Sequence, residues 1–181
     1  MYNSWKKEIL MKTLLILTFI LSFLNASILD IKTFEADFNQ TITDEKNNIL
    51  KYNGHVIASH SNNAKWNYTS PILKDVYISK YEAVIVEPEI EQVIIRTISS
   101  DFDFFSLVKS AKKISKNTYI AKFNTKEYKI EEKDGKIKSI SFLDHYENKV
   151  KILFSNQKQN HKIDSKRFTP NYPMDFDIIR D

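Results

Sequence analysis

The chain has 181 residues, of which 42% are hydrophobic and 28% charged, and its formal net charge is +4. This composition predicts a single globular domain and excludes the disordered and fibrous classes of protein. The absence of cysteine excludes thiol catalysis, disulfides and cysteine-bound zinc or iron–sulfur clusters, and two glycines are too few for a phosphate-binding loop of the Walker or Rossmann type.

Residues 1–26 have the order of a secretory signal peptide. Three lysines precede an apolar run at residues 14–24, and small residues follow it, so we expect cleavage after Ala26. The alternative is a membrane anchor, but eleven residues at about 1.5 Å each reach only roughly half of the bilayer hydrocarbon. Met11 begins a more usual signal peptide than the first methionine does, so residues 1–10 are interpreted as a start-site extension.

Cleavage would leave one mature domain at residues 27–181. Its formal charge would be +2, because residues 1–26 contain three lysines and one glutamate. An exported domain that is nearly neutral is not expected to bind nucleic acid. The sequence contains no internal repeat or linker that would divide this domain further.

Alternating apolar residues predict a mainly β protein. Residues 34–42 are apolar at every second position apart from Gln40, which is the pattern of a half-buried strand. The same period, or a short β-branched run, recurs in eight further segments: Val56/Ala58, Trp66/Tyr68, Val76/Ile78, 83–86, 93–95, Tyr119/Ala121/Phe123, Tyr128/Ile130 and Val150/Ile152/Phe154. Asp134-Gly135 predicts a tight hairpin. About ten strands at this spacing predict an antiparallel sheet that curls or closes.

Residues 101–114 break the alternation. Their apolar residues follow a spacing of three or four, which predicts one amphipathic helix across the segment. Its end begins the densest basic stretch of the mature chain, which consists of Lys109, Lys112, Lys113 and Lys116. These lysines are interpreted as a solvated helix end, and contact with an acidic partner or anionic lipid headgroups is the alternative.

The sequence offers little that resembles a catalytic or metal site. No pair among the four histidines has a metal-ligand spacing, and the carboxylates alternate with lysines as on a solvated face. No serine is flanked by the glycines of a nucleophile elbow. We therefore expect neither an enzyme nor a metal or cofactor site.

Aromatic residues are abundant after residue 26, where ten Phe, eight Tyr and one Trp remain. One interpretation is that these rings fill the core of a sandwich. The other is that a strongly curved sheet leaves an apolar cavity wider than its own side chains can fill, with the 102–108 segment across its opening. Periodicity alone leaves both interpretations open.

Several short motifs occur in one order along nearly the whole mature chain. They are Phe34-x-Ala36-x-Phe38-x-Gln40-Thr41, Trp66-x-Tyr68-x-x-Pro71, Glu87-Pro88 followed by Glu91-Gln92-Val93, Asp103-Phe-Phe105-Ser-Leu107, Phe168-Thr-Pro170 and Phe176-Asp-Ile178-Ile179. Each motif is weak by itself. Together, behind a signal peptide and without cysteine, their order and spacing resemble the LolA family of outer-membrane lipoprotein carriers.

The resemblance implies an unclosed, or half, antiparallel β-barrel with short helices that form a lid over a hydrophobic cavity. It implies a periplasmic chaperone that shields lipoprotein acyl chains and carries lipoproteins from the inner to the outer membrane. The implied partners are these lipoproteins and an ABC-type release complex of the inner membrane, and the cargo is delivered either to the outer membrane itself or to a receptor there. We expect a monomer without a cofactor.

The resemblance and the alternation together predict which residues bind acyl chains. The inward-facing cavity residues are predicted to be Phe34, Ala36, Phe38, Trp66, Tyr68, Val76, Ile78, Val84 and Val86. The lid residues are predicted to be Phe102, Phe104, Phe105, Leu107 and Val108. For every one of them an ordinary core role is the alternative.

Two features depart from the family pattern. The residues before Trp66 lack the Arg-Pro pair whose arginine helps to hold the lid in many members, so that role cannot be transferred to this chain. The N-terminal helix is also shortened, since about seven residues separate the expected cleavage site from the first strand. The functional alternatives are a periplasmic lipid- or lipoprotein-sensing module without transport, and a hydrolase, against which the missing nucleophile counts.

Overall fold

The computed structural model describes residues 27–60, 63–98, 104–123 and 125–180, so the predicted signal peptide lies outside the described residues. Twelve strands occur within these ranges: β1 (Thr33–Thr43), β2 (Ile49–Ser59), β3 (Asn63–Ser70), β4 (Lys74–Ile78), β5 (Glu82–Glu87), β6 (Gln92–Thr97), β7 (Lys112–Ser115), β8 (Thr118–Phe123), β9 (Lys126–Lys133), β10 (Lys136–Leu143), β11 (Lys149–Gln159) and β12 (Asp177–Arg180). The helical segments are α2 (Phe104–Ser110) and three short 3-10 turns, η1 (Ile28–Asp30), η2 (Pro88–Ile90) and η3 (Ser165–Phe168).

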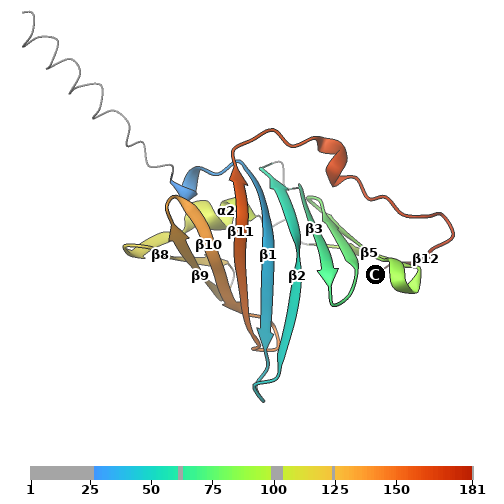
Figure 1. Ribbon diagram of the computed structural model, residues 1–181, viewed down its shortest axis with the longest axis horizontal. Coiled ribbons are helices and arrows are strands. Elements are labelled where there is room, and N and C mark those ends of the chain that lie inside the picture. Colours follow the sequence, from blue (N-terminus) through green and yellow to red (C-terminus); the bar gives the residue numbers. More distant parts are fainter. Residues whose placement is uncertain (1–26, 61–62, 99–103, 124, 181) are drawn as a thin grey trace, which may run out of the picture.

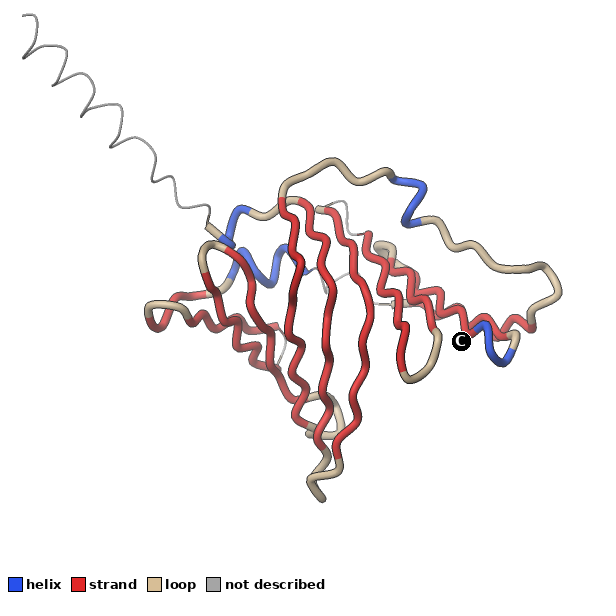
Figure 2. The backbone as a smooth tube through the Cα atoms, viewed as in Figure 1, coloured by secondary structure: helices blue, strands red, loops and turns tan. Residues whose placement is uncertain are grey.

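The strands form one curved sheet in the order β12-β6-β5-β4-β3-β2-β1-β11-β10-β9-β8-β7 (Figure 1). Every neighbouring pair is antiparallel except β12 and β6, which run parallel. Within the described ranges no pairing joins β12 to β7, so the sheet does not close. The helical segments are short: α2 lies behind the sheet, and η3 lies within the long connection between β11 and β12 (Figure 2). The predicted unclosed, mainly β architecture is confirmed.

The alternation of residues 34–42 sets the two faces of the sheet. Phe34, Ala36 and Phe38 are at most 1% exposed on what we call the inner face, and the residues between them are only partly buried on the outer face. Side chains from η1, α2 and the inner faces of β8 to β11 join them in one core cluster. The strand prediction is therefore correct in register as well as in position.

The hairpin between β9 and β10 follows from its two turn residues. Asp134 and Gly135 have φ values of 54° and 73°, the left-handed conformations that a two-residue hairpin of the primed type requires. Asp and Gly adopt this region more readily than other residues do. The predicted tight hairpin at this dipeptide is present.

The predicted helix across residues 101–114 is too long. The helix α2 ends at Ser110, and β7 begins at Lys112 and pairs antiparallel with β8. The β7 backbone finds partners on the free edge of β8, and this pairing outweighs the helical spacing of the side chains. Two of the four lysines of this stretch, Lys112 and Lys113, therefore lie on an edge strand, where charged side chains discourage further strand pairing.

A second, smaller core lies on the outer face, away from α2. Tyr77, Val84, Val86 and Val93 pack there against Tyr172 and Phe176. Figure 1 shows the chain after β11 crossing to the far edge of the sheet, where β12 pairs with β6. The C-terminal segment, residues 160–176, thus supplies the outer cover of β4 to β6. Among the described helices, none has the length and apolar character needed to cross a membrane.

Candidate functional site

An apolar cavity of about 230 Å³ lies between α2 and the inner face of the sheet. Side chains from β2, β3 and β4 border one side, and side chains from β9, β10 and β11 border the other. The lining residues are Ala58, Ser59, Asn63, Ala64, Trp66, Ile78, Ser79, Lys80, Phe104, Phe105, Leu107, Tyr128, Ile140, Phe142, Ile152 and Phe154. Most of these side chains are apolar, so the cavity suits a hydrocarbon ligand.

Aromatic rings connect α2 to the sheet beneath it. The ring of Phe104 lies 5.5 Å from that of Phe34, and Phe34 in turn lies 5.2 Å from Phe154 across the inner face. Phe105 is 5% exposed and touches Phe104 at 5.3 Å between ring centres. In this state α2 therefore covers part of the inner face with its own rings.

A second set of rings lies deeper on the inner face. Phe38 contacts Trp66 at 5.0 Å and Tyr68 at 5.1 Å between ring centres, both in edge-on arrangements. The Tyr68 hydroxyl donates a hydrogen bond to the Gln40 side chain at 3.2 Å, and burial raises the pKa of Tyr68 to about 12. Gln40, the polar interruption in the β1 alternation, thus has a polar partner among aromatic neighbours.

The predicted cavity and lid residues divide into four groups, the last of which is the pair Val84 and Val86 on the outer face. Trp66, Ile78, Phe104, Phe105 and Leu107 line the cavity directly. A second group belongs to the packed core around it or to the inner face beside it, and consists of Phe34, Ala36, Phe38, Tyr68, Val76 and Val108. Phe102 lies outside the described residues.

Two residues that were predicted to line the cavity lie on the outer face of the sheet instead. Val84 pairs with Tyr77 and Val86 with Asp75, which places both valines on the outer face, in the second core. The inner face of β5 carries Ile85 instead, opposite Val76. The run of residues 83–86 is apolar on both faces, so its sequence does not indicate which side faces the cavity.

The far wall of the cavity was not predicted as a site. It consists of Tyr128, Ile140, Phe142, Ile152 and Phe154 from β9, β10 and β11. The alternation at 128/130 and 150/152/154 predicts strands with one apolar face, but not that this face meets β3 across the cavity. That information lies in the sheet order, in which β1 pairs with β11.

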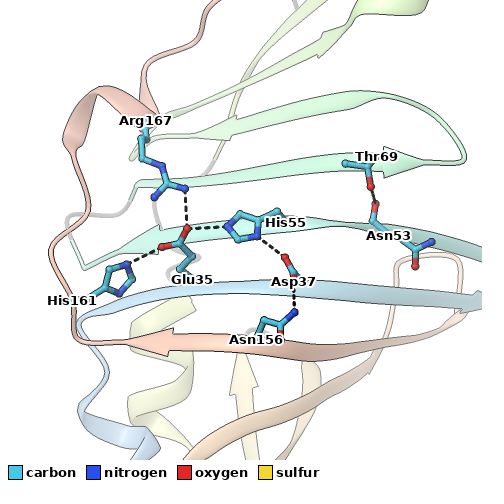
Figure 3. Close-up of polar contacts among 8 residues, drawn as sticks. All are labelled: Glu35, Asp37, Asn53, His55, Thr69, Asn156, His161 and Arg167. Atoms are coloured by element: carbon cyan, nitrogen blue, oxygen red, sulfur yellow. Dashed lines mark hydrogen bonds and ion pairs between the residues drawn. The ribbon is translucent and has the colours of Figure 1, made fainter.

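A polar network on the outer face ties the C-terminal segment to β1 and β2 (Figure 3). Arg167 donates to Glu35 at 2.9 Å, and the Nε2 atoms of His161 and His55 lie 2.8 Å and 3.0 Å from the same carboxylate. The hydrogen bond from Arg167, with those from His55 and His161, lowers the pKa of Glu35 to about 2 although burial opposes the shift. Glu35 is therefore the anionic centre of this network.

His55 joins Glu35 to Asp37 on the same strand. Its Nδ1 lies 2.7 Å from Asp37, whose other carboxylate oxygen accepts a hydrogen bond from Asn156 at 2.7 Å. A neutral imidazole has one N–H, so both of its carboxylate contacts are hydrogen bonds only when the ring is doubly protonated. The network is on the face opposite the cavity, and we assign it a role in holding the C-terminal segment.

Comparison with known proteins identifies the family of this chain. The family model for the outer membrane lipoprotein carrier protein LolA matches residues 30–128, which include β1 to β8 and α2. The chain belongs to the LolA family.

Curated relatives extend the LolA match beyond residue 128. The outer-membrane lipoprotein carrier protein of Campylobacter jejuni is 37% identical over 169 residues, covering 93% of this chain and 99% of that protein. The protein of the same name from Helicobacter hepaticus is 32% identical over 173 residues, covering 95% of this chain and 97% of its own.

A solved structure is similar to this chain in its fold, and the similarity bears on the fold only. An uncharacterized conserved protein from Thermus thermophilus superposes with a TM-score of 0.52 at 12% identity, covering 87% of this chain and 95% of that chain. At this identity the similarity concerns the fold of the curved sheet and not a ligand or a function.

Proposed function

We propose that this protein is a periplasmic chaperone that shields lipoprotein acyl chains and carries lipoproteins from the inner to the outer membrane. The observation that carries the proposal is the apolar cavity between α2 and the curved sheet, in a chain that belongs to the LolA family. The names of its relatives are consistent with lipoprotein cargo.

The energetics of acyl chains explain why such a carrier is needed. Each methylene group removed from water contributes about 0.8 kcal/mol, so a chain of roughly 15 methylenes exposed in an aqueous compartment costs about 12 kcal/mol. A lipoprotein with several chains would not cross the periplasm uncovered. An apolar cavity offsets this cost without covalent chemistry, so we propose a binding role and no enzymatic activity.

The cavity is small for such cargo. Its volume of about 230 Å³ is below the roughly 300–1,000 Å³ of ordinary ligand sites. Phe104 and Phe105 of α2 lie against the inner face where acyl chains would lie, so uptake requires these rings to move aside. We propose that α2 is the lid and that ring and ligand compete for one apolar surface, which keeps binding reversible.

The proposal also includes the cellular location of the protein and its partners. Residues 1–26 would be cleaved on export and residues 27–181 would act in the periplasm as a monomer. An ABC-type complex of the inner membrane would supply the cargo, and an outer-membrane receptor or the membrane itself would accept it. N-terminal sequencing of the protein recovered from the periplasm tests the cleavage, with Ser27 expected as the first residue.

A release assay tests the transport function. Spheroplasts that hold labelled lipoproteins are incubated with the purified protein, and the supernatant is analysed for a one-to-one complex. The expected result is release of lipoprotein by the wild type and by Thr69→Glu, but not by Trp66→Glu, because Trp66 lines the cavity and Thr69 is exposed on the same strand. Binding without release would indicate a sensing module instead.

A further inference from the structure

The cavity is polarised along its length. Four polar lining residues, Ser59, Asn63, Ser79 and Lys80, lie around the β2–β3 and β4–β5 turns. These turns are adjacent, because the pairing of Ala64 with Ile78 brings Asn63 and Ser79 to the same end of the sheet. The opposite end is bordered by Phe142 and Ile152. A ligand that matches this lining has a polar head at the turns and an apolar tail below them.

Lys80 gives the polar end a positive charge. It is exposed in the turn between β4 and β5, and its ammonium lies 4.9 Å from the ring centre of Tyr81. The nearest acidic residue in sequence, Glu82, contributes its backbone carbonyl to the turn by accepting hydrogen bonds from Ser79. No carboxylate of the described residues forms an ion pair with Lys80. A contact with an aromatic ring leaves its N–H donors available.

The lining has the length of a single acyl chain. Ala58 lies opposite Phe34, and Ile152 lies opposite Gln40, so the lining extends over at least six residue steps of β1, from residue 34 to residue 40. At about 3.4 Å per residue this is roughly 20 Å. An acyl chain in a bilayer spans one leaflet, which is half of the ~30 Å hydrocarbon core or about 15 Å. The lining is therefore long enough for one such chain. A volume of about 230 Å³ drawn out over this length is narrow and favours one chain.

From the polar rim, the unpaired lysine and the single-chain dimensions, we infer that the cavity also binds single-chain amphiphiles with an anionic head, such as long-chain carboxylates, with the head beside Lys80. The inference rests on the acyl-chain cavity of the proposed function. It adds a second ligand class, because the ester and amide groups at the head of a lipoprotein's acyl chains are neutral and cannot form an ion pair with Lys80.

Tryptophan fluorescence provides the test. The chain has two tryptophans, so Trp5→Phe leaves Trp66, which lines the cavity, as the reporter. The full chain with this substitution is titrated with palmitate, hexadecyl phosphate and hexadecanol below their aggregation concentrations. We expect both anions to bind about three- to fivefold more tightly than hexadecanol, as a partly exposed charge pair allows. Tighter binding of palmitate than of hexadecyl phosphate would identify a carboxylate as the preferred head, and the reverse order would identify a phosphate.

Two substitutions of Lys80 test whether this residue causes the preference for an anionic head. Lys80→Gln should reduce palmitate affinity to that of hexadecanol, and Lys80→Glu should reduce it further, while hexadecanol affinity stays the same. Lys46→Gln, an exposed lysine on the turn at the other end of the sheet, is the matched control and should change neither. Circular dichroism checks that each variant is folded.

The outcomes separate this inference from the transport proposal. Equal wild-type affinities for palmitate and hexadecanol, no binding of either, or unchanged discrimination in Lys80→Gln would each overturn the inference. Lipoprotein release in the spheroplast assay with any of these results would leave transport intact. Conversely, Lys80-dependent palmitate binding by a protein that releases no lipoprotein would support the ligand class and reject the carrier.

Discussion

Gly54 lies at a position of the inner face where the surrounding atoms leave no room for a side chain. A Cβ atom built there would clash with the backbone carbonyl of Asn67 and lie 2.7 Å from the ring of Phe38. The ring therefore lies directly over the β2 backbone. The absence of a side chain is what allows Phe38 to reach Trp66 and Tyr68 at the centre of the aromatic layer.

Gly54→Ala should consequently destabilise the protein by about 2 kcal/mol or more, because the added methyl group overpacks a ring and a carbonyl that cannot both move. Urea unfolding followed by circular dichroism measures the change. Asn53→Ala, an exposed neighbour on the same strand, is the control and should lie within about 0.5 kcal/mol of wild type. Equal midpoints for the two variants would contradict the close packing at Gly54.

Ile152 and Leu153 are neighbours on β11 and lie on opposite faces of the sheet. Ile152 is 8% exposed and lines the cavity, whereas Leu153 is 42% exposed on the other face. Ile152→Glu should abolish acyl-chain binding, because a carboxylate in an apolar cavity costs several kcal/mol or draws in water. Leu153→Glu adds the same charge one residue along and should bind normally. Titration with a fluorescent acyl probe compares them, and normal binding by Ile152→Glu would exclude this wall from the site.

At the scale of elements, α2 is the segment whose position limits the space for ligand. It has seven residues and buries Phe105, Leu107 and Val108 against the sheet and η1. A helix this short depends on packing and not on its own propensity. Its order should therefore respond to whatever occupies the inner face.

Hydrogen exchange with and without a bound acyl chain tests this dependence. The amides of α2 should show the largest change in protection, because ligand replaces the rings that now hold the helix in place. The amides of β1, which lies between β2 and β11, serve as the internal reference and should change little. High and unchanged protection across α2 would mean that its phenylalanines are ordinary core.

The contrast between β1 and β5 explains how far the sequence predicts the elements. In β1, strict alternation assigns Phe34, Ala36 and Phe38 to one face, and the structure agrees. In β5, four consecutive apolar residues are compatible with either face of the sheet. Val84 and Val86 lie on the outer face because they pack there in the cluster that Tyr172 and Phe176 cover, and these two residues are far along the chain. Local pattern therefore predicts strands well, and it predicts faces only where polar residues alternate.

The cavity itself depends on long-range order that periodicity does not encode. Trp66 and Phe104 could be assigned to the site from the aromatic pattern and the family motifs. The opposite wall, which includes Phe142 and Phe154, reaches the site because β11 pairs with β1 and brings β10 and β9 along. The same holds for the end of α2, where pairing of β7 with β8 replaces the predicted continuation of the helix.

Across the whole molecule, Glu35 connects the C-terminal segment to the first strands. Its folded-state pKa is about 2, below its ordinary value of 4.5, chiefly because of Arg167. A lowered folded-state pKa gives stability that is present above about pH 4.5 and is lost as the pH falls toward 2. We therefore expect the network to hold through the neutral range and to fail in strong acid.

The difference in unfolding free energy between wild type and Glu35→Gln should be about 2 kcal/mol at pH 7, allowing for the partial exposure of Arg167, and should approach zero near pH 2. Urea unfolding at a series of pH values measures it. Glu45→Gln, an exposed glutamate in the β1–β2 turn, should show no such trend. A difference for Glu35→Gln that is independent of pH would mean that its charge does not hold the segment.

The pairing of β1 with β11 has a consequence for the time course of folding. Asp37 and Asn156, which face each other across these strands, are 119 residues apart in sequence. A sheet whose central seam joins such distant segments has a high contact order, and proteins of that kind fold slowly because a long loop must close before its contacts form. A newly made chain would thus stay unfolded for longer than a helical protein of equal length. That delay would suit the proposed export, in which the chain would pass through a narrow secretion channel before it folds.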